Sequence, residues 1–126
     1  MPEILLRSEE SDGVVSLIDN TVPANWDGPY LHKHDFDETF YVIEGELTFQ
    51  LGDELFRAKA GDIAFAPRGV PHTYANLSAT PTRHLIVCTP AGFERYFARM
   101  LDDPPEWAQQ EIPFTVERVG PQIARS

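Results

Sequence analysis

The chain has 126 residues, 42% of them hydrophobic and 24% charged, which is enough for one globular core and too short for two. Twenty acidic residues against ten basic ones give a formal net charge of -10, which disfavours nucleic acids and anionic membranes as partners. The single cysteine, Cys88, excludes an internal disulfide. Apolar runs fall far short of the roughly 20 residues of a membrane span, and the first residues lack a signal-peptide pattern, so we expect an intracellular, cytoplasmic protein.

Most of the chain has the pattern of short β-strands. Eleven prolines and eight glycines divide it into short segments that are rich in β-branched and aromatic residues. Gly52-Asp53 follows an alternating run and predicts a hairpin turn within residues 46–58. Many short strands separated by turn signals predict an antiparallel sandwich or barrel. In chain order, the expected strands are residues 14–18, 39–43, 46–51, 63–66 and 83–88, with a last strand at 114–119.

One segment after these strands has helical periodicity. We expect Thr89-Pro90 to start this helix and the acidic, proline-containing run after residue 101 to end it. The apolar face predicts a helix that packs against the outside of the sheet, and a lid over a ligand pocket is the alternative. The residues that form this face are Phe93, Tyr96, Phe97, Met100 and Leu101.

Three of the four histidines are spaced in a way that suits metal binding. His32 and His34 stand two residues apart, so in a strand both imidazoles point to the same side. Glu38 keeps that parity in an extended chain, and a proline- and glycine-containing turn precedes His72 and would bring it in from a neighbouring strand. Three imidazoles and one carboxylate suit a divalent first-row transition metal. Taken singly, each histidine also fits an ordinary surface or core role.

Two longer patterns contain these four residues, and both resemble signatures of the cupin superfamily. The first pattern is His32-x-His34-x3-Glu38-x6-Gly45. The second, which matches at every prescribed position, is Gly61-x5-Pro67-x-Gly69-x2-His72-x3-Asn76. The chain departs from the family at one point: the glycine that usually stands six positions before the first histidine is replaced by Trp26, and the nearest glycine is Gly28.

The resemblance implies an all-β fold, the double-stranded β-helix or cupin jelly roll, with one short C-terminal α-helix. It implies a single cupin domain over residues 1–126, with the core barrel at about 14–88 and the helix and tail at about 89–126. It also implies one divalent transition metal ion (Fe, Ni, Mn, Co, Cu or Zn) and a homodimer, for which an uncovered edge strand gives a physical basis. The implied metal ligands are His32, His34, Glu38 and His72.

The C-terminal segments are similar to small bacterial single-domain cupins that resemble quercetin 2,3-dioxygenases. This resemblance implies a metal-dependent, dioxygenase-like enzyme for a small aromatic or enolic substrate, with Glu38 as both ligand and general base. The alternatives are a cupin isomerase, cyclase or lyase without oxygen chemistry, and a non-enzymatic cupin that binds a small ligand. Ordinary core packing is the alternative for the residues expected in the substrate pocket, which are Phe40, Phe49, Tyr74 and His84.

Overall fold

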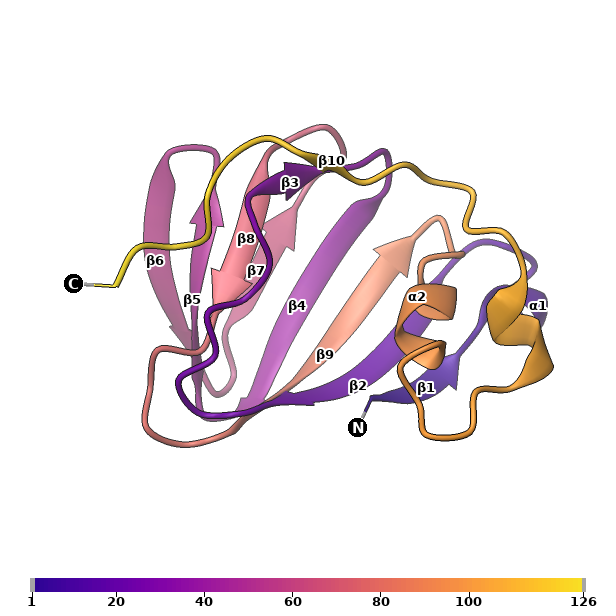
Figure 1. Ribbon diagram of the computed structural model, residues 1–126, viewed down its shortest axis with the longest axis horizontal. Helices are drawn as coiled ribbons and strands as arrows, with labels where there is room; N and C mark the ends of the chain where they lie inside the picture. The colour runs from indigo at the N-terminus through magenta and orange to yellow at the C-terminus, as the bar shows by residue number, and fades with distance from the viewer. Residues whose placement is uncertain (1, 126) are drawn as a thin grey trace.

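The computed structural model describes residues 2–125, in which two antiparallel sheets of five strands enclose a common core (Figure 1). One sheet has the strand order β1-β2-β9-β4-β7 and the other β10-β3-β8-β5-β6. The predicted all-β jelly roll is therefore confirmed. The elements in chain order are β1 (Glu3–Leu6), α1 (Ser8–Ser11), β2 (Ser16–Val22), β3 (His32–Lys33), β4 (Asp37–Glu44), β5 (Glu46–Leu51), β6 (Glu54–Lys59), β7 (Ile63–Ala66), β8 (His72–Ala75), β9 (Thr82–Thr89), α2 (Glu94–Ala98), the 3-10 helix η1 (Glu106–Gln109) and β10 (Glu117–Arg118).

The predicted hairpin is formed by β5 and β6. Leu51 pairs with Glu54, so Gly52-Asp53 is the two-residue connection, as the sequence indicates. On β5, Leu47 and Phe49 are buried, while Glu46, Thr48 and Gln50 are only partly buried. This alternation is the period of two expected for a strand with one face in the core.

The space between the two sheets is filled by aromatic and branched side chains from their inner faces. The ring of Phe40 on β4 lies 5.1 Å from that of Phe49 on β5 and 4.9 Å from that of Tyr74 on β8 (centroid distances). Ile18 and Ile86 are fully buried beside them. These side chains form the packed core between the two sheets.

Several element ends differ from the sequence-based expectation. The helix α2 covers only five residues, because Thr89 belongs to β9, where it pairs with Asp37, and Phe93 precedes the first helical residue. After the helix, the Arg99 side chain donates to the carbonyl oxygens of Ala108 and Gln110, which draws the chain back instead of extending the helix. The last strand is limited to β10, and β2 begins two residues later than expected. The elements β1, α1 and η1 carry no clear periodic signal and were not predicted.

The missing glycine at Trp26 has a local explanation. Trp26 and Asn76 exchange two backbone hydrogen bonds of 2.8 and 2.9 Å, which dock the loop before β3 onto the end of β8. Gly28, two residues further on, has a φ of +75°, and a Cβ atom there would overlap the carbonyl oxygen of Tyr74. The close approach that requires a glycine is therefore made at residue 28.

A buried carboxylate, Glu94, links helix α2 to the N-terminal turn at Ser8. Its side chain is fully buried, and Oε2 accepts hydrogen bonds of 2.6 Å from both the backbone N–H and the hydroxyl of Ser8, at the start of α1. Its Oε1 accepts a third hydrogen bond, of 2.7 Å, from the backbone N–H of Gly92. Three donors compensate the cost of burying the charge, and they fix α2 against the N-terminal turn.

The edges of the sheets are β1 and β7 in one sheet and β10 and β6 in the other. The homodimer expected from an uncovered edge stays a prediction. None of the helices within residues 2–125 combines the length and the apolarity needed to cross a membrane.

We expect Glu94→Ala to lower the free energy of unfolding by about 3 kcal/mol, because the substitution leaves buried donors on Ser8 and Gly92 unpaired. Chemical denaturation followed by circular dichroism measures this change. The matched control is Glu106→Ala in η1, whose exposed side chain makes no such contacts and whose removal should change stability by less than about 0.5 kcal/mol. Equal effects of the two substitutions would contradict the assigned role.

Candidate metal centre

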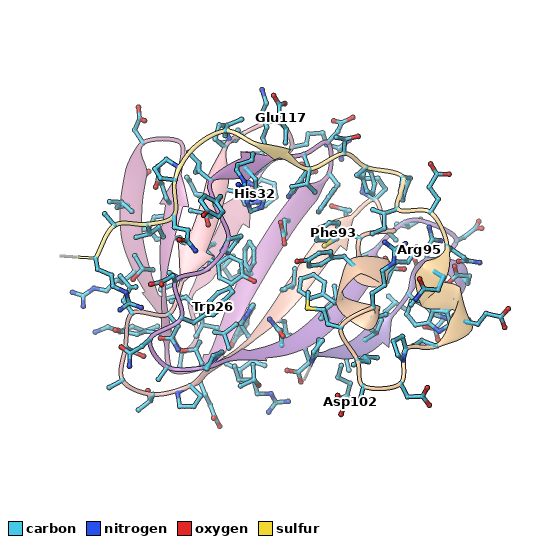
Figure 2. All side chains as sticks on the ribbon, viewed as in Figure 1. Trp26, His32, Phe93, Arg95, Asp102 and Glu117 are labelled. Carbon is cyan, nitrogen blue, oxygen red and sulfur yellow. The ribbon has the colours of Figure 1, made fainter. Side chains whose placement is uncertain are left out.

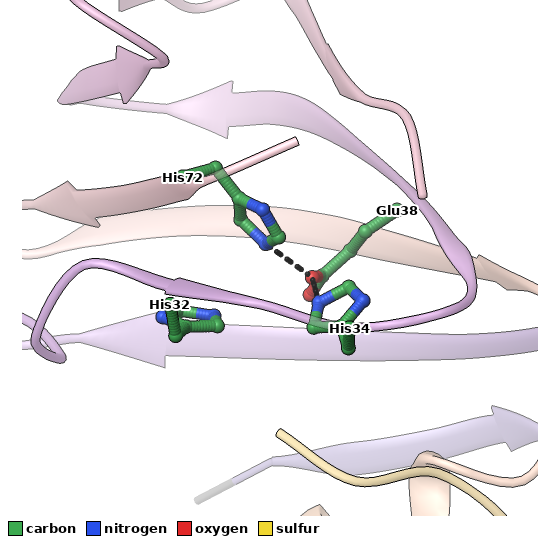
Figure 3. A group of neighbouring side chains, drawn as sticks. All are labelled: His32, His34, Glu38 and His72. Carbon is green, nitrogen blue, oxygen red and sulfur yellow. Dashed lines mark hydrogen bonds and ion pairs between the residues drawn. The ribbon is translucent and has the colours of Figure 1, made fainter. Parts of the chain in front are cut away.

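The four predicted ligand residues converge at one end of the barrel, where the two sheets meet (Figure 3). His32 lies on β3 directly opposite His72 on β8, and His34 follows β3 by one residue. Glu38 reaches the same point from β4, in the other sheet. One potential ligand atom from each of the four side chains lies within 4.8 Å of all the others. The register of β3 and β8 therefore brings together residues that are 40 positions apart in the sequence.

Each of the three imidazoles is oriented by a backbone carbonyl group two residues away. The Nδ1 atom of His32 lies 2.7 Å from the oxygen of Tyr30, and that of His72 lies 3.0 Å from the oxygen of Val70. In His34 the partner is the oxygen of Phe36, at 3.1 Å. A carbonyl group only accepts, so Nδ1 carries the proton in all three rings. The Nε2 atoms are thereby left to face the centre of the cluster, which is the arrangement of metal-binding histidines.

An aromatic stack holds His34 in place as well. Its ring lies parallel to that of Phe36, with the centroids 3.6 Å apart and an angle of 4° between the planes. Phe36 is itself covered by Phe114 from the C-terminal tail, at 4.7 Å. The tail therefore restricts the movement of a ligand residue that belongs to the other end of the chain.

Glu38 supplies the negative charge of the cluster. Burial by itself raises its pKa, but hydrogen bonds from Nε2 of His34 (3.0 Å) and of His72 (3.1 Å) outweigh burial and lower the pKa of Glu38 to about 2. For His72, burial lowers the pKa, but the hydrogen bond with Glu38 prevails and raises it. Burial lowers the pKa of His32. The carboxylate is thus ionised at neutral pH, and it lies at hydrogen-bond distance from the Nε2 atoms of His34 and His72 at the centre of the cluster.

This set of donors fits a single transition metal ion. Bonds of about 2.0–2.2 Å to imidazole nitrogen and carboxylate oxygen place any two ligand atoms at most about 4.4 Å apart. The cluster needs to contract by only a few tenths of an ångström to meet that limit, and three neutral imidazoles with one carboxylate suit a borderline divalent ion. His32, His34, Glu38 and His72 would hold the metal.

The comparisons with known proteins agree with this geometry. The family model for the cupin domain matches residues 20–88, which include all four cluster residues. The chain belongs to the cupin family. A quercetin 2,3-dioxygenase from Bacillus subtilis (strain 168) is 30% identical over 104 residues, which are 82% of this chain and 30% of that protein.

Two solved structures resemble this cupin as well. A predicted oxalate decarboxylase from Thermotoga maritima superimposes with a TM-score of 0.66 at 26% identity, covering 71% of this chain and 78% of that one. A protein with a double-stranded β-helix domain from Klebsiella pneumoniae gives a TM-score of 0.63 at 19% identity, covering 93% and 83%. This cupin spans only 30% to 49% of the lengths of the curated relatives that it matches.

A cavity of about 840 Å³ opens beside the cluster. Of the four cluster residues, only His32 and Glu38 contribute to its wall. Figure 2 shows the labelled side chains of Trp26, His32 and Phe93, which come from three separate segments and border this space. The wall is largely apolar, as is typical of a small-molecule site. A ligand in the cavity would meet the centre from the side of His32 and Glu38.

Of the four residues predicted to line the substrate pocket, one lies on the cavity wall and three lie in the packed core. Tyr74 lies on the cavity wall. Phe40, Phe49 and His84 do face the interior, as their strand parity indicates, but they are fully buried in the packed core and are absent from the wall. Strand parity separates inside from outside, and it cannot separate filled core from open cavity.

Sequence reasoning missed most of the wall. The loop before β3 contributes Trp26, and the C-terminal tail contributes Ile112, Phe114 and Val116. One signal was available, namely the apolar stripe around α2. The helix packs against β1 and β2, but on the core side and not on the outside of the sheet, since Phe97 belongs to the core and the stripe borders the cavity through Phe93, Tyr96, Phe97 and Met100. Its alternative interpretation as a lid over a bound ligand stays a prediction.

We expect His72→Ala to reduce bound transition metal from about one ion per chain to near zero, because a ligand with a fixed orientation is lost. Elemental analysis of the purified protein measures the content. The control is His84→Phe, which removes the one histidine outside the cluster and should leave the metal content unchanged. Full occupancy in His72→Ala would contradict the assignment.

We expect His84 to make the protein less stable in acid. Burial lowers the pKa of His84 from 6.5 to about 4, so the unfolded chain takes up a proton at a higher pH than the folded protein does. The free energy of unfolding therefore has its full value above pH 6.5 and falls as the pH drops towards 4. The loss over this range amounts to about 3 kcal/mol. Unfolding measured on metal-free protein should therefore show that His84→Phe loses about 3 kcal/mol less than the wild type between these pH values. Parallel stability curves for the two proteins would contradict this.

Proposed function

We propose that this cupin is a metal-dependent, dioxygenase-like oxidoreductase that acts on a small aromatic or enolic substrate. The observation that carries the proposal is the joint placement of Glu38 and His32, which belong both to the cluster of metal-binding side chains and to the wall of an aromatic cavity. A substrate oxygen can thus reach the centre while the rest of the molecule contacts apolar side chains. The name of the Bacillus subtilis relative supports the same class of chemistry.

The composition of the cavity argues for an aromatic substrate over a small diacid. Among the wall residues that the structure describes, Arg118 is the only lysine or arginine, and its guanidinium carbon lies 3.9 Å from the ring centroid of Tyr30. A dianion of oxalate size would need several cationic donors and would leave most of an 840 Å³ cavity empty. A molecule with one or more aromatic rings matches both the volume and the apolar wall.

The metal, Glu38 and the aromatic wall have different roles in the proposed reaction. When bound, a divalent transition metal supplies Lewis acidity and open positions for substrate oxygen. Glu38 takes the proton of the substrate's enolic hydroxyl, which leaves the substrate electron-rich. The aromatic wall holds the ring system and excludes water. In the overall reaction the substrate is oxidised, O2 is reduced, and both oxygen atoms end in the product.

Oxygen consumption with a flavonol, quercetin, tests the proposal. Metal-loaded wild type should take up oxygen in step with the loss of quercetin absorbance, and Glu38→Gln should be slower by about 100-fold, because the proton acceptor is gone. The matched control is Asp37→Asn, which changes the neighbouring carboxylate. That group forms an ion pair with Arg68 and does not line the cavity, so the control should keep the wild-type rate.

The same assay separates the alternatives. Turnover at an unchanged rate without oxygen would replace the dioxygenase with an isomerase, cyclase or lyase. Tight binding of quercetin with no product after long incubation would replace it with a binding protein. Either outcome would overturn the proposal.

A further inference from the structure

A polar pair lies in the core of the barrel away from the metal centre. Asn20 on β2 and His84 on β9 are register partners, and both are buried, with exposed fractions of 9% and 0%. Nδ2 of Asn20 lies 3.4 Å from Nε2 of His84. Asn20 lines the cavity and His84 stands behind it. The pair therefore brings a polar group to a wall that is otherwise mostly apolar.

The contact with His84 decides which atom of the Asn20 side chain is left for a ligand. Burial lowers the pKa of His84 to about 4, so the ring is neutral at pH 7. In the tautomer with the proton on Nδ1, the Nε2 atom accepts a hydrogen bond from the Asn20 amide. The amide oxygen Oδ1 then makes no hydrogen bond to any residue between 2 and 125. Oδ1 is not among the fully buried side-chain atoms that lack a partner, and Asn20 lines the cavity, so this oxygen is open to a hydrogen-bond donor on a ligand or a water there.

His84 itself is incompletely satisfied, which argues against a purely structural pair. Its Nδ1 atom is buried and has no hydrogen-bond partner among the residues that the structure describes. Apolar side chains at both positions would avoid this cost. The single hydrogen-bond contact of the imidazole, from Nε2 to Nδ2 of Asn20, orients the Asn20 side chain on the cavity wall.

The two polar parts of the wall are well separated. Glu38 pairs with Cys88, and Asn20 pairs with His84, so the two levels are four residues apart along β9. At about 3.3 Å per residue this is roughly 13 Å of backbone. The same wall carries Tyr74 and Trp26, whose ring centroids are 5.2 Å apart. Glu38 and Asn20 are therefore two separate polar points on a largely apolar wall, which also carries the polar side chains of Arg118 and Gln122.

We propose that Asn20 forms a second polar subsite, which binds a hydroxyl group at the end of an elongated aromatic substrate remote from the metal, with His84 as its positioning residue. The inference rests on the proposed function and narrows the substrate class to phenols of more than one ring. One oxygen of the substrate reaches the centre at Glu38, the rings lie along Tyr74 and Trp26, and a distal hydroxyl donates to Oδ1 of Asn20.

Two flavonols that differ by one hydroxyl group test the subsite. The probes are 3-hydroxyflavone and 3,4′-dihydroxyflavone, the second of which carries an additional hydroxyl on the ring remote from the enolic oxygen. Trp107→Phe leaves Trp26, on the cavity wall, as the single tryptophan, and quenching of its fluorescence reports binding to metal-loaded protein. In this background the dihydroxy compound should bind about 10-fold more tightly, as one hydrogen bond predicts.

Substitutions on the protein side should remove this preference. Asn20→Leu should weaken the dihydroxy compound about 10-fold and change the monohydroxy compound by less than about 2-fold. His84→Phe should reduce the preference in the same way, and His84→Gln, which keeps an acceptor for the Asn20 amide, should restore part of it. Thr39→Val, which removes a hydroxyl group from β4 outside the cavity wall, should leave the preference intact.

The outcomes distinguish the two proposals. If both probes bind with equal affinity to the wild type, or if Asn20→Leu weakens both equally, the subsite is wrong while the metal-dependent aromatic site stands. If His72→Ala, emptied of metal, binds both probes as tightly as the loaded wild type, the proposed function is wrong as well. The wild-type comparison of the two probes tests the subsite even if a substituted protein fails to fold.

Discussion

The site depends on one constraint, namely the hydrogen bond that each ligand histidine makes from Nδ1 to a carbonyl group two residues away. These bonds fix the tautomer of three rings and turn their Nε2 atoms towards Glu38. Without them, three imidazoles beside a buried carboxylate would have many competing hydrogen-bond patterns. Because the carbonyl groups belong to the same short segments as the histidines, the local backbone sets the orientation of the rings.

The cavity has the opposite origin, since its wall is assembled from segments that are far apart in the sequence. The loop before β3 is fixed to β8 through Trp26 and Asn76, and the tail is fixed beside β3, where the backbone N–H of Val119 donates to the oxygen of Leu31. Helix α2 is held by Glu94, which reaches Ser8 at the other end of the chain. The metal ligands are thus preset locally, and the shape of the substrate space depends on long-range contacts.

This difference explains what the sequence could predict. His32, His34 and Glu38 are readable because strand parity puts them on one side, and His72 is readable because it completes a spaced pattern around a turn. The pocket cannot be predicted in this way, because strand parity predicts an inward side chain both for Phe40, which fills the core, and for Tyr74, which faces the cavity. Trp26 and Phe114 carry no local signal for their place on the wall, and the role of Gly28 appears only when its distance to Tyr74 is known.

The central claim is that one ion is held by three Nε2 atoms and one carboxylate at the junction of the two sheets. Anomalous diffraction from crystals of metal-loaded protein, recorded at the absorption edge of the bound metal, tests it most directly. We expect a single strong anomalous peak about 2.0–2.2 Å from Nε2 of His32, His34 and His72 and from an oxygen of Glu38. A peak elsewhere in the molecule, or an ion bound through Nδ1 or by fewer than three of these histidines, would contradict it.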